Sequence, residues 1–174
     1  MPAWPEDTRA GEKGVCDVNG DRKTPAGGLG KVICIAVIAA AAAHPAKADE
    51  IRIKMLDTGA SGPLAFEPGF VQAKVGDTIV FEPTPRGGHS TVSLLVPPGA
   101  QAWSGAADKE VRVTLDAQGV YLYACSAHKM MGMVGVIQVG KPVNLDEANR
   151  VAKAESAKFV MNKDRFDKEL AQVN

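Results

Sequence analysis

Cys125-Ser-Ala-His-Lys-Met-Met-Gly-Met133 is the stretch around which the rest of this chain is arranged. It places one thiol, one imidazole and three thioethers within nine consecutive residues. Residues 120–124 before it and 134–139 after it are rich in β-branched and aromatic side chains, which favour β-strands. We therefore expect a loop between two strands, and Gly88-His89 upstream adds a second imidazole from another part of the chain.

A thiolate, two imidazoles and a weak, distant thioether form the ligand set of blue-copper electron-transfer sites. Cys125 directly follows a predicted strand, and His128, three residues later, can turn back toward the same metal. His89 would come from a separate strand, so that the fold itself fixes the third ligand of the plane. The sequence thus predicts one type 1 copper ion in a geometry that suits both Cu(I) and Cu(II).

Three methionines follow His128, and the axial ligand has to be chosen among them. Met131 would leave two residues between itself and His128, whereas Met133 leaves four. We prefer Met133, because Gly132 allows a turn before it and the next predicted strand begins at Val134. Met131 is then expected beside the site rather than as a ligand.

Each of these residue types has an ordinary structural role when it is taken alone. A single Cys is usually a small buried hydrophobe, and clustered Met side chains usually fill gaps in a core. A structural zinc site prefers several Cys or His ligands and gains nothing from a thioether. A Cys–His hydrolase would need an orienting Asn or Asp and would leave Met133 unexplained. The combination favours copper and electron transfer over zinc or catalysis.

The N-terminal part of the chain is typical of an exported protein. Lys31 precedes an uncharged apolar run over residues 32–43, and Ala46-Lys47-Ala48 offers small residues where a signal peptidase reads them. We expect residues 31–48 to be a signal peptide that is cleaved after Ala48, which places the protein in the periplasm. The polar residues 1–30 precede this signal and are expected to be a disordered extension from a misassigned start codon.

Export also bears on the cysteine count. The expected mature chain keeps only Cys125, and a lone thiol is a liability in an oxidising compartment. A metal-bound thiolate explains why such a residue is present.

Composition limits the classes of function. The 174 residues carry 20 basic and 20 acidic side chains, and this zero net charge argues against a nucleic-acid-binding protein. A hydrophobic content of 45% supports a single core. We expect a monomer without stable membrane association.

Short β-prone segments, separated by Gly and Pro turns, continue through residue 139. The segments are residues 50–55, 66–75, 78–82, 91–95, 110–115, 120–124 and 134–139. Gly76-Asp77, between two of them, is typical of a hairpin turn. Because no helical pattern separates the segments, they predict a mainly β fold, a Greek-key antiparallel β-sandwich over residues 49–140.

The pattern changes in residues 141–174, which are expected to form two α-helices packed on the sandwich. Asn144 and Glu147 have the spacing of a capping box, at the start of a helix that runs to about Ala157. A second helix from about residue 162 would carry an apolar face formed by Phe166, Leu170 and Val173.

These features together resemble the cupredoxin family, and within it the pseudoazurins. The resemblance covers the expected mature chain and is carried by Gly88-His89, Cys125-x-x-His128, Met131-Gly132-Met133, residues 51–60 and the helical end of the chain. It implies a periplasmic electron carrier and not an enzyme, which accepts electrons from a cytochrome and donates them to a copper nitrite reductase or a similar acceptor. Three other functions stay open: an amicyanin-like carrier for an amine dehydrogenase, a copper storage or delivery protein, and a subunit of a larger oxidase.

Two positions depart from the pseudoazurin pattern. Ser90 stands where an Asn usually braces the copper loops, and Ala127 stands where a Pro usually precedes the second His. Ser90 can replace that bracing only in part, whereas the backbone N–H of Ala127 is an added donor near the sulfur or a point of entry for water. The resemblance therefore implies an altered reduction potential, without fixing its sign.

The expected route for the electron is the exposed edge of His128. Met130 would supply apolar surface there, which suits brief docking over a small area. The basic residues expected to steer an acidic partner are Lys129, Arg86, Lys54 and Lys109.

Overall fold

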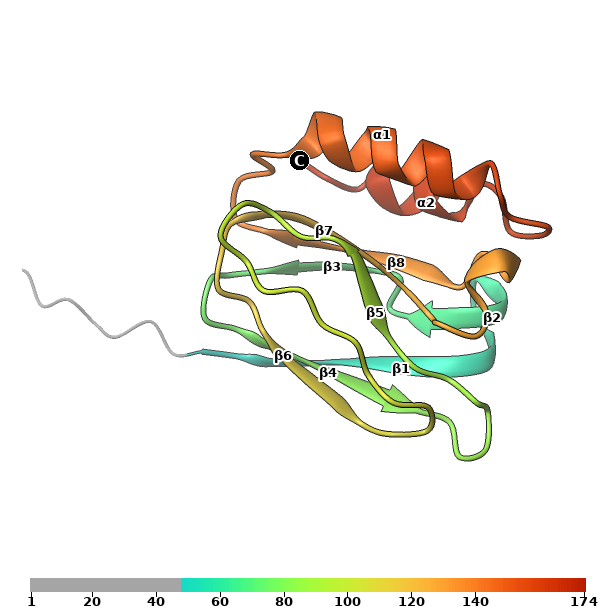
Figure 1. Ribbon diagram of the computed structural model, residues 1–174. Coiled ribbons are helices and arrows are strands. Elements are labelled where there is room, and N and C mark those ends of the chain that lie inside the picture. Colours follow the sequence, from blue (N-terminus) through green and yellow to red (C-terminus); the bar gives the residue numbers. More distant parts are fainter. Residues whose placement is uncertain (1–47) are drawn as a thin grey trace, which may run out of the picture. The chain divides into compact units, whose positions relative to one another are not determined.

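Two four-stranded sheets pack face to face in residues 48–174, the part of the chain that the computed structural model describes (Figure 1). One sheet has the strand order β2 (Gly62–Glu67), β1 (Glu50–Gly59), β4 (Thr78–Pro83) and β6 (Val111–Thr114). The other has the order β3 (Phe70–Ala73), β8 (Val134–Val139), β7 (Gly119–Ala124) and β5 (Val92–Leu95). The predicted β-sandwich is confirmed, whereas the predictions for residues 1–47 lie outside the described residues.

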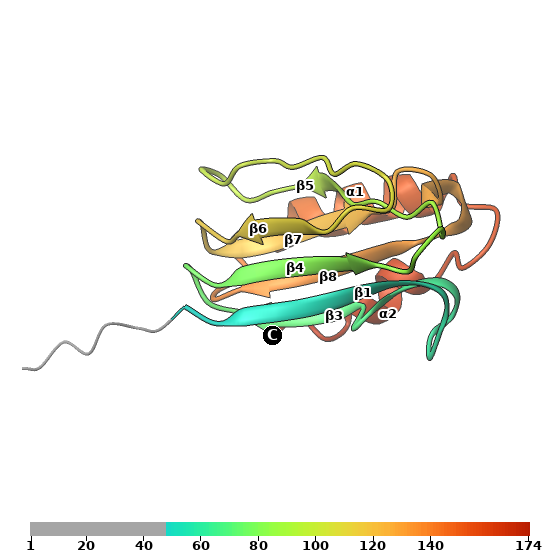
Figure 2. The same ribbon diagram turned by 90° about the horizontal axis from the view of Figure 1, so that it is seen from below.

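Strand pairing is mixed rather than purely antiparallel. β1 runs parallel to β4 (Figure 2), and β3 runs parallel to β8. The other neighbours within the two sheets are antiparallel, as expected. The two parallel pairs arise because consecutive strands often belong to different sheets, so that a strand meets a neighbour that the chain reaches only after crossing over.

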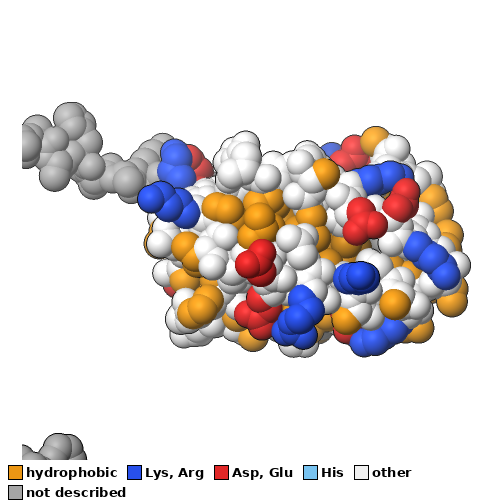
Figure 3. All heavy atoms as spheres, turned by 90° about the horizontal axis from the view of Figure 1, so that it is seen from above, with side chains coloured by type: hydrophobic (Ala, Val, Ile, Leu, Met, Phe, Trp, Pro, Cys, Tyr) orange, Lys and Arg blue, Asp and Glu red, His pale blue; other side chains and the backbone are white. Residues whose placement is uncertain are grey.

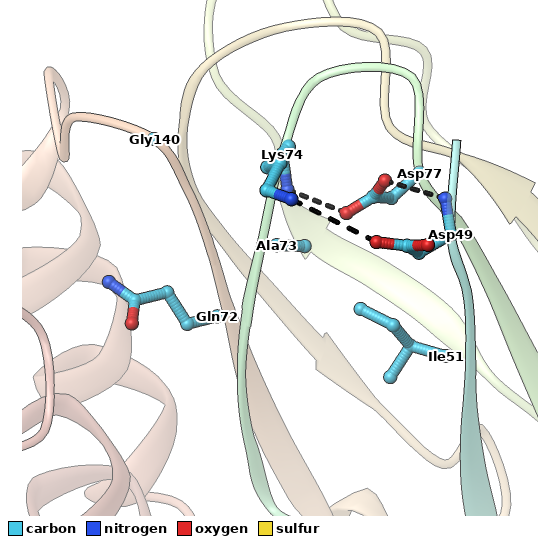
Figure 4. A pocket seen from close by; sticks show the side chains of 7 residues that line it. All are labelled: Asp49, Ile51, Gln72, Ala73, Lys74, Asp77 and Gly140. Atoms are coloured by element: carbon cyan, nitrogen blue, oxygen red, sulfur yellow. Dashed lines mark hydrogen bonds and ion pairs between the residues drawn. The ribbon is translucent and has the colours of Figure 1, made fainter. Parts of the chain in front are cut away.

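The hairpin predicted at Gly76-Asp77 is not formed. β3 before this turn and β4 after it lie in different sheets, so the turn carries the chain across the sandwich. The Asp77 carboxylate accepts the backbone N–H groups of Asp49 at 2.9 Å and Lys74 at 2.8 Å (Figure 4). These two donors lower the pKa of Asp77. The crossing is therefore held by an ionised carboxylate rather than by strand pairing.

Aromatic and aliphatic side chains fill the space between the two sheets. The ring of Tyr123 lies 4.8 Å from that of Phe66 and 5.0 Å from that of Phe81, centroid to centroid, and both pairs meet edge to face. β7 and β8 are buried at every position, because one face meets this core and the other meets the helices. Double burial explains the nearly continuous apolar character of these two strands.

Two C-terminal helices cover the outer face of the sheet that contains β7 and β8 (Figure 1). α1 (Leu145–Ser156) packs on β7, and α2 (Arg165–Leu170) packs on β8. The apolar residues buried between the helices and this sheet are Val120, Leu122, Ala124, Val134, Val136, Ala148, Ala152, Phe159 and Phe166. Figure 3 shows charges of both signs scattered over this side of the molecule, between apolar patches. The predicted pair of packed helices is confirmed.

The start of α1 differs from the predicted capping box. Asn144 occupies the N-cap position, but its side chain makes no capping hydrogen bond. Instead Oδ1 accepts the backbone N–H of Val120 at 2.7 Å, and Nδ2 donates to the carbonyl of Val120 at 2.9 Å. The capping box is therefore wrong, because the Asn144 side chain is committed to β7 and ties the helix to the sheet.

Replacing Asn144 with alanine is expected to lower the free energy of unfolding by about 1–3 kcal/mol. The change leaves the buried N–H and C=O of Val120 without these partners. Urea titration of the two proteins measures the difference, with the exposed Gln118→Ala variant as control. Equal stability of the Asn144 and Gln118 variants would contradict the assignment.

Candidate metal centre

The loop between β7 and β8 carries three of the predicted ligands, which are Cys125, His128 and Met133. Its ends are joined by the backbone N–H of Cys125, which donates to the carbonyl of Met133 at 2.9 Å. The short 3-10 helix η1 (Lys129–Met131) follows His128 within the loop. Gly132 then turns the chain with a φ of +71°, and a Cβ at this position would approach the Cβ of Asn162 to 2.8 Å. A glycine is required here for both its conformation and its size.

His89 lies in the loop between β4 and β5, and not on a strand as the sequence had predicted. Its carbonyl accepts the N–H of Asp108 at 2.7 Å, and the Asp108 carboxylate accepts the N–H of Gly88 at 2.8 Å. The imidazole also packs tightly against Gly87, where an added Cβ would lie 2.5 Å from Cδ2 of His89. This loop therefore holds the His89 ring in one place, completely buried.

His89, Cys125 and His128 converge although 36 residues separate the first two. One potential ligand atom from each lies within 4.8 Å of the other two. The Cys125 Sγ is 3.4 Å from Nδ1 of His128, and the two imidazole centroids are 5.0 Å apart. Met133 is completely buried in the same core cluster as Cys125, whereas Met131 is only partly buried. The burial pattern thus supports Met133 over Met131.

The donor atoms fit a copper ion. Nε2 of His89 lies 3.1 Å from Oδ1 of Asp57. The other ring nitrogen, Nδ1, is buried and has no hydrogen-bond partner among the described residues. A buried polar atom without a partner is costly unless something else satisfies it. A soft sulfur beside two imidazole nitrogens is the donor set that copper prefers. The orphaned nitrogen and its neighbours therefore match the metal that the sequence predicts.

The surroundings of His128 favour its neutral form, which is the form that binds metals. Burial lowers the pKa of His128, and the nearby His89 lowers it further, while Asp57 acts in the opposite direction. Because a protonated imidazole cannot be a ligand, a lowered pKa extends the pH range in which His128 can bind a metal toward more acidic conditions.

Ser90 links the two loops that form the site. Its backbone N–H points at the Cys125 Sγ at 3.5 Å, and its hydroxyl accepts the N–H of Ser126 at 3.3 Å. These two contacts are consistent with the partial bracing predicted for Ser90. The contact to the sulfur predicted for Ala127 is made by Ser90 instead among the described residues, and Ala127 itself is exposed.

The residues predicted for docking lie in different settings. Met130 is 48% exposed and lies on η1, which begins directly after His128. Lys129 forms an ion pair with Glu155 of α1 at 3.2 Å, so its charge is already partly neutralised. The remaining basic residues, all exposed, are Arg86, Lys54 and Lys109.

Three residues near the site carry no sequence signal that marks them. Asp57 lies 3.1 Å from Nε2 of His89. Asn162 Nδ2 donates to the carbonyl of Met131 at 2.9 Å, and Arg165 Nη1 donates to the carbonyl of Gly132 at 2.8 Å. Asp57 lies between two predicted strands, and Asn162 and Arg165 belong to an amphipathic segment. Only the fold brings them to the ligand loop.

The chain is similar to known copper proteins over its β-sandwich. Residues 53–140 match the family described as copper-binding proteins of the plastocyanin/azurin family. Pseudoazurin from Methylorubrum extorquens is 41% identical over 116 residues, which cover 66% of this chain and 78% of the relative. Pseudoazurin from Paracoccus pantotrophus is 37% identical over 136 residues, which cover 77% of this chain and 90% of the relative.

A solved pseudoazurin structure is also similar to this chain. The crystal structure of pseudoazurin from Hyphomicrobium denitrificans superimposes with a TM-score of 0.61 at 34% identity. The alignment covers 72% of this chain and 98% of the other.

Proposed function

This chain belongs to the plastocyanin/azurin family of copper-binding proteins, in its pseudoazurin branch, and from that membership we propose that it carries single electrons between redox proteins of the periplasm. It is a blue-copper electron carrier and not an enzyme. The copper ligands in this proposal are His89, Cys125, His128 and Met133.

The orphaned Nδ1 of His89 is the observation that carries the ligand assignment. This nitrogen is buried and has no described hydrogen-bond partner, and its residue belongs to the cluster with Cys125 and His128. When bound, copper supplies a one-electron Cu(I)/Cu(II) couple. The chain contributes rigidity, because both ligand loops are tied down by backbone hydrogen bonds and joined through Ser90. Fixed ligands keep rearrangement small when an electron arrives or leaves.

The surface around His128 supports brief docking. Exposed Met130 offers apolar contact beside the site. Exposed Arg86 lies in the loop that carries His89, and exposed Lys109 follows Asp108, which is hydrogen-bonded to this loop. In this proposal an electron enters from a cytochrome and leaves to a copper nitrite reductase or a similar acceptor with an acidic docking face. Steering by such charges weakens as ionic strength rises.

Export to the periplasm is part of the same proposal. The signal peptide read in residues 31–48, with cleavage after Ala48, supports it. No helix within residues 48–174 has both the length and the apolar character needed to cross a membrane.

Loading the exported protein with Cu(II) is expected to produce an intense visible absorption band that disappears on reduction and returns on reoxidation. Thiolate sulfur bonded to Cu(II) is the source of such a band, and fixed ligands make the cycle reversible. Visible spectroscopy through several cycles of ascorbate and ferricyanide measures it. Bound copper without the band, or copper that is lost on reduction, would contradict the electron carrier and favour copper delivery.

The acceptor is tested separately. Stopped-flow mixing of the reduced protein with a copper nitrite reductase should return the band, at a rate that falls as salt is added. A protein that cycles reversibly but transfers no electrons to this enzyme would refute the acceptor and leave the carrier function intact.

A further inference from the structure

Asp57 lies where the inner face of β1 meets the metal centre. Ile53 and Met55 on this strand are completely buried between the sheets. Since alternate residues of a strand share a face, Asp57 is the next position on the same face. β1 continues to Gly59, beyond the predicted strand of residues 50–55, so that Asp57 belongs to the strand. A carboxylate thus stands at the end of a row of buried apolar side chains.

The carboxylate of Asp57 is directed at a proposed copper ligand. Its Oδ1 lies 3.1 Å from Nε2 of His89. The side chain of Asp57 is 63% exposed, whereas that of His89 is completely buried. His89 is the only hydrogen-bonding partner of this carboxylate within residues 48–174. Asp57 therefore neither caps a turn nor pairs with a Lys or Arg side chain in the described part of the chain.

The direction of this hydrogen bond fixes the protons of His89. An ionised carboxylate can only accept, so Nε2 of His89 must carry the hydrogen. In a neutral imidazole the other nitrogen, Nδ1, then presents its lone pair. Nδ1 is buried without a hydrogen-bond partner among the described residues, and His89 belongs to the cluster with Cys125 and His128. A carboxylate that holds the far nitrogen of a metal-binding His in this way orients the ring and makes it a stronger donor.

We infer that Asp57 is a positioning residue, which holds His89 in its metal-binding tautomer and biases the centre toward its oxidised state. The inference rests on the proposed function, because it takes His89 as a ligand. The bias follows from charge: the oxidised centre carries one more positive charge than the reduced one, and a nearby carboxylate stabilises it more.

The Asp57→Asn variant isolates the charge. The amide oxygen of Asn still accepts from Nε2 of His89, but the negative charge is gone. We expect the equilibrium with a reference redox protein to shift toward the reduced form by about tenfold, which is 59 mV for a one-electron couple. Asp116→Asn is the matched control, because it also removes an exposed charge, but near the start of β7, whereas the ligand loop follows the end of this strand. Equal shifts in both variants, or none in Asp57→Asn, would overturn the electrostatic role.

The Asp57→Leu variant tests the hydrogen bond without copper. In the copper-free protein, nitrogen-15 NMR should show His89 of the wild type as a single tautomer with the hydrogen on Nε2. Asp57→Leu should show a mixture of tautomers, whereas Asp57→Asn should keep the single form. A single Nε2–H tautomer in the Leu variant would overturn the positioning role. Because this measurement needs no metal, it decides the tautomer even if copper loading gives no blue protein and the proposed function fails.

Discussion

The Cys125→Ser variant is expected to lose the intense visible band completely. A serine oxygen is a hard donor and does not form the thiolate bond to copper from which the absorption arises. His89 and His128 remain, so that some Cu(II) still binds, but the protein should be nearly colourless and inactive as an electron carrier. Visible absorption at equal copper content, together with the rate of electron transfer to the acceptor, measures the loss.

Ser126→Ala is the matched control for this change. Ser126 is the neighbour of Cys125, but it is exposed, and the contact to Ser90 is made through its backbone N–H. The band should therefore survive in this variant. A second check is stability: free copper at about 100 times its Kd stabilises a folded protein by about 2.7 kcal/mol, and Cys125→Ser should lose much of this gain. An intense band in Cys125→Ser would refute Cys125 as a ligand.

Replacing Arg165 with leucine is expected to cost about 3–5 kcal/mol of unfolding free energy. Arg165 is only 4% exposed, although it belongs to a short surface helix. Its guanidinium donates to backbone carbonyls in the β1–β2 turn, in β2 and in the ligand loop, those of Ser61, Pro63, Leu64 and Gly132. Removing it leaves these carbonyls without their shared donor, and each buried polar group without a partner costs about 1–3 kcal/mol.

Thermal and urea unfolding of the copper-free proteins measure the cost for Arg165. Arg150→Leu is the control, since Arg150 on α1 is exposed and forms a surface pair with Glu147, which is worth less than about 1 kcal/mol. An Arg165→Lys variant should fall between the wild type and the Leu variant, because Lys keeps the charge but cannot reach several carbonyls with a planar fork. Similar losses in the Arg150 and Arg165 Leu variants would contradict the structural role.

Arg165 also explains how the C-terminal helices bear on the metal centre. Its carbonyl partner Gly132 precedes Met133, and Asn162 holds the carbonyl of Met131 at the same point. The segment between α1 and α2 packs so closely on Gly132 that a side chain there would clash with Met161 and Asn162. The helical end of the chain therefore supports the ligand loop from outside the β-sandwich.

Much of the metal centre is determined by short-range sequence. Cys125 and His128 are three residues apart at the end of a strand, so that the loop alone brings them to 3.4 Å. The alternation of apolar residues along Ile51, Ile53 and Met55 likewise predicts a half-buried strand. In such cases the spacing of neighbours along the chain decides the structure, because backbone geometry relates residues a few positions apart.

The tertiary structure alone decided the partners of several polar residues. The side chain of Asn144 is hydrogen-bonded to Val120 instead of capping its helix, and that of Asp57 is hydrogen-bonded to His89. Arg165 reaches Pro63 and Leu64, about a hundred residues earlier. The parallel pairing of β1 with β4 was likewise decided only by the tertiary structure. These contacts depend on which faces of distant elements pack together, and the local pattern of polar and apolar residues does not contain that information. The sequence by itself determined the fold class and the copper-binding residue types, whereas the packing of sheets and helices decided what holds them in place.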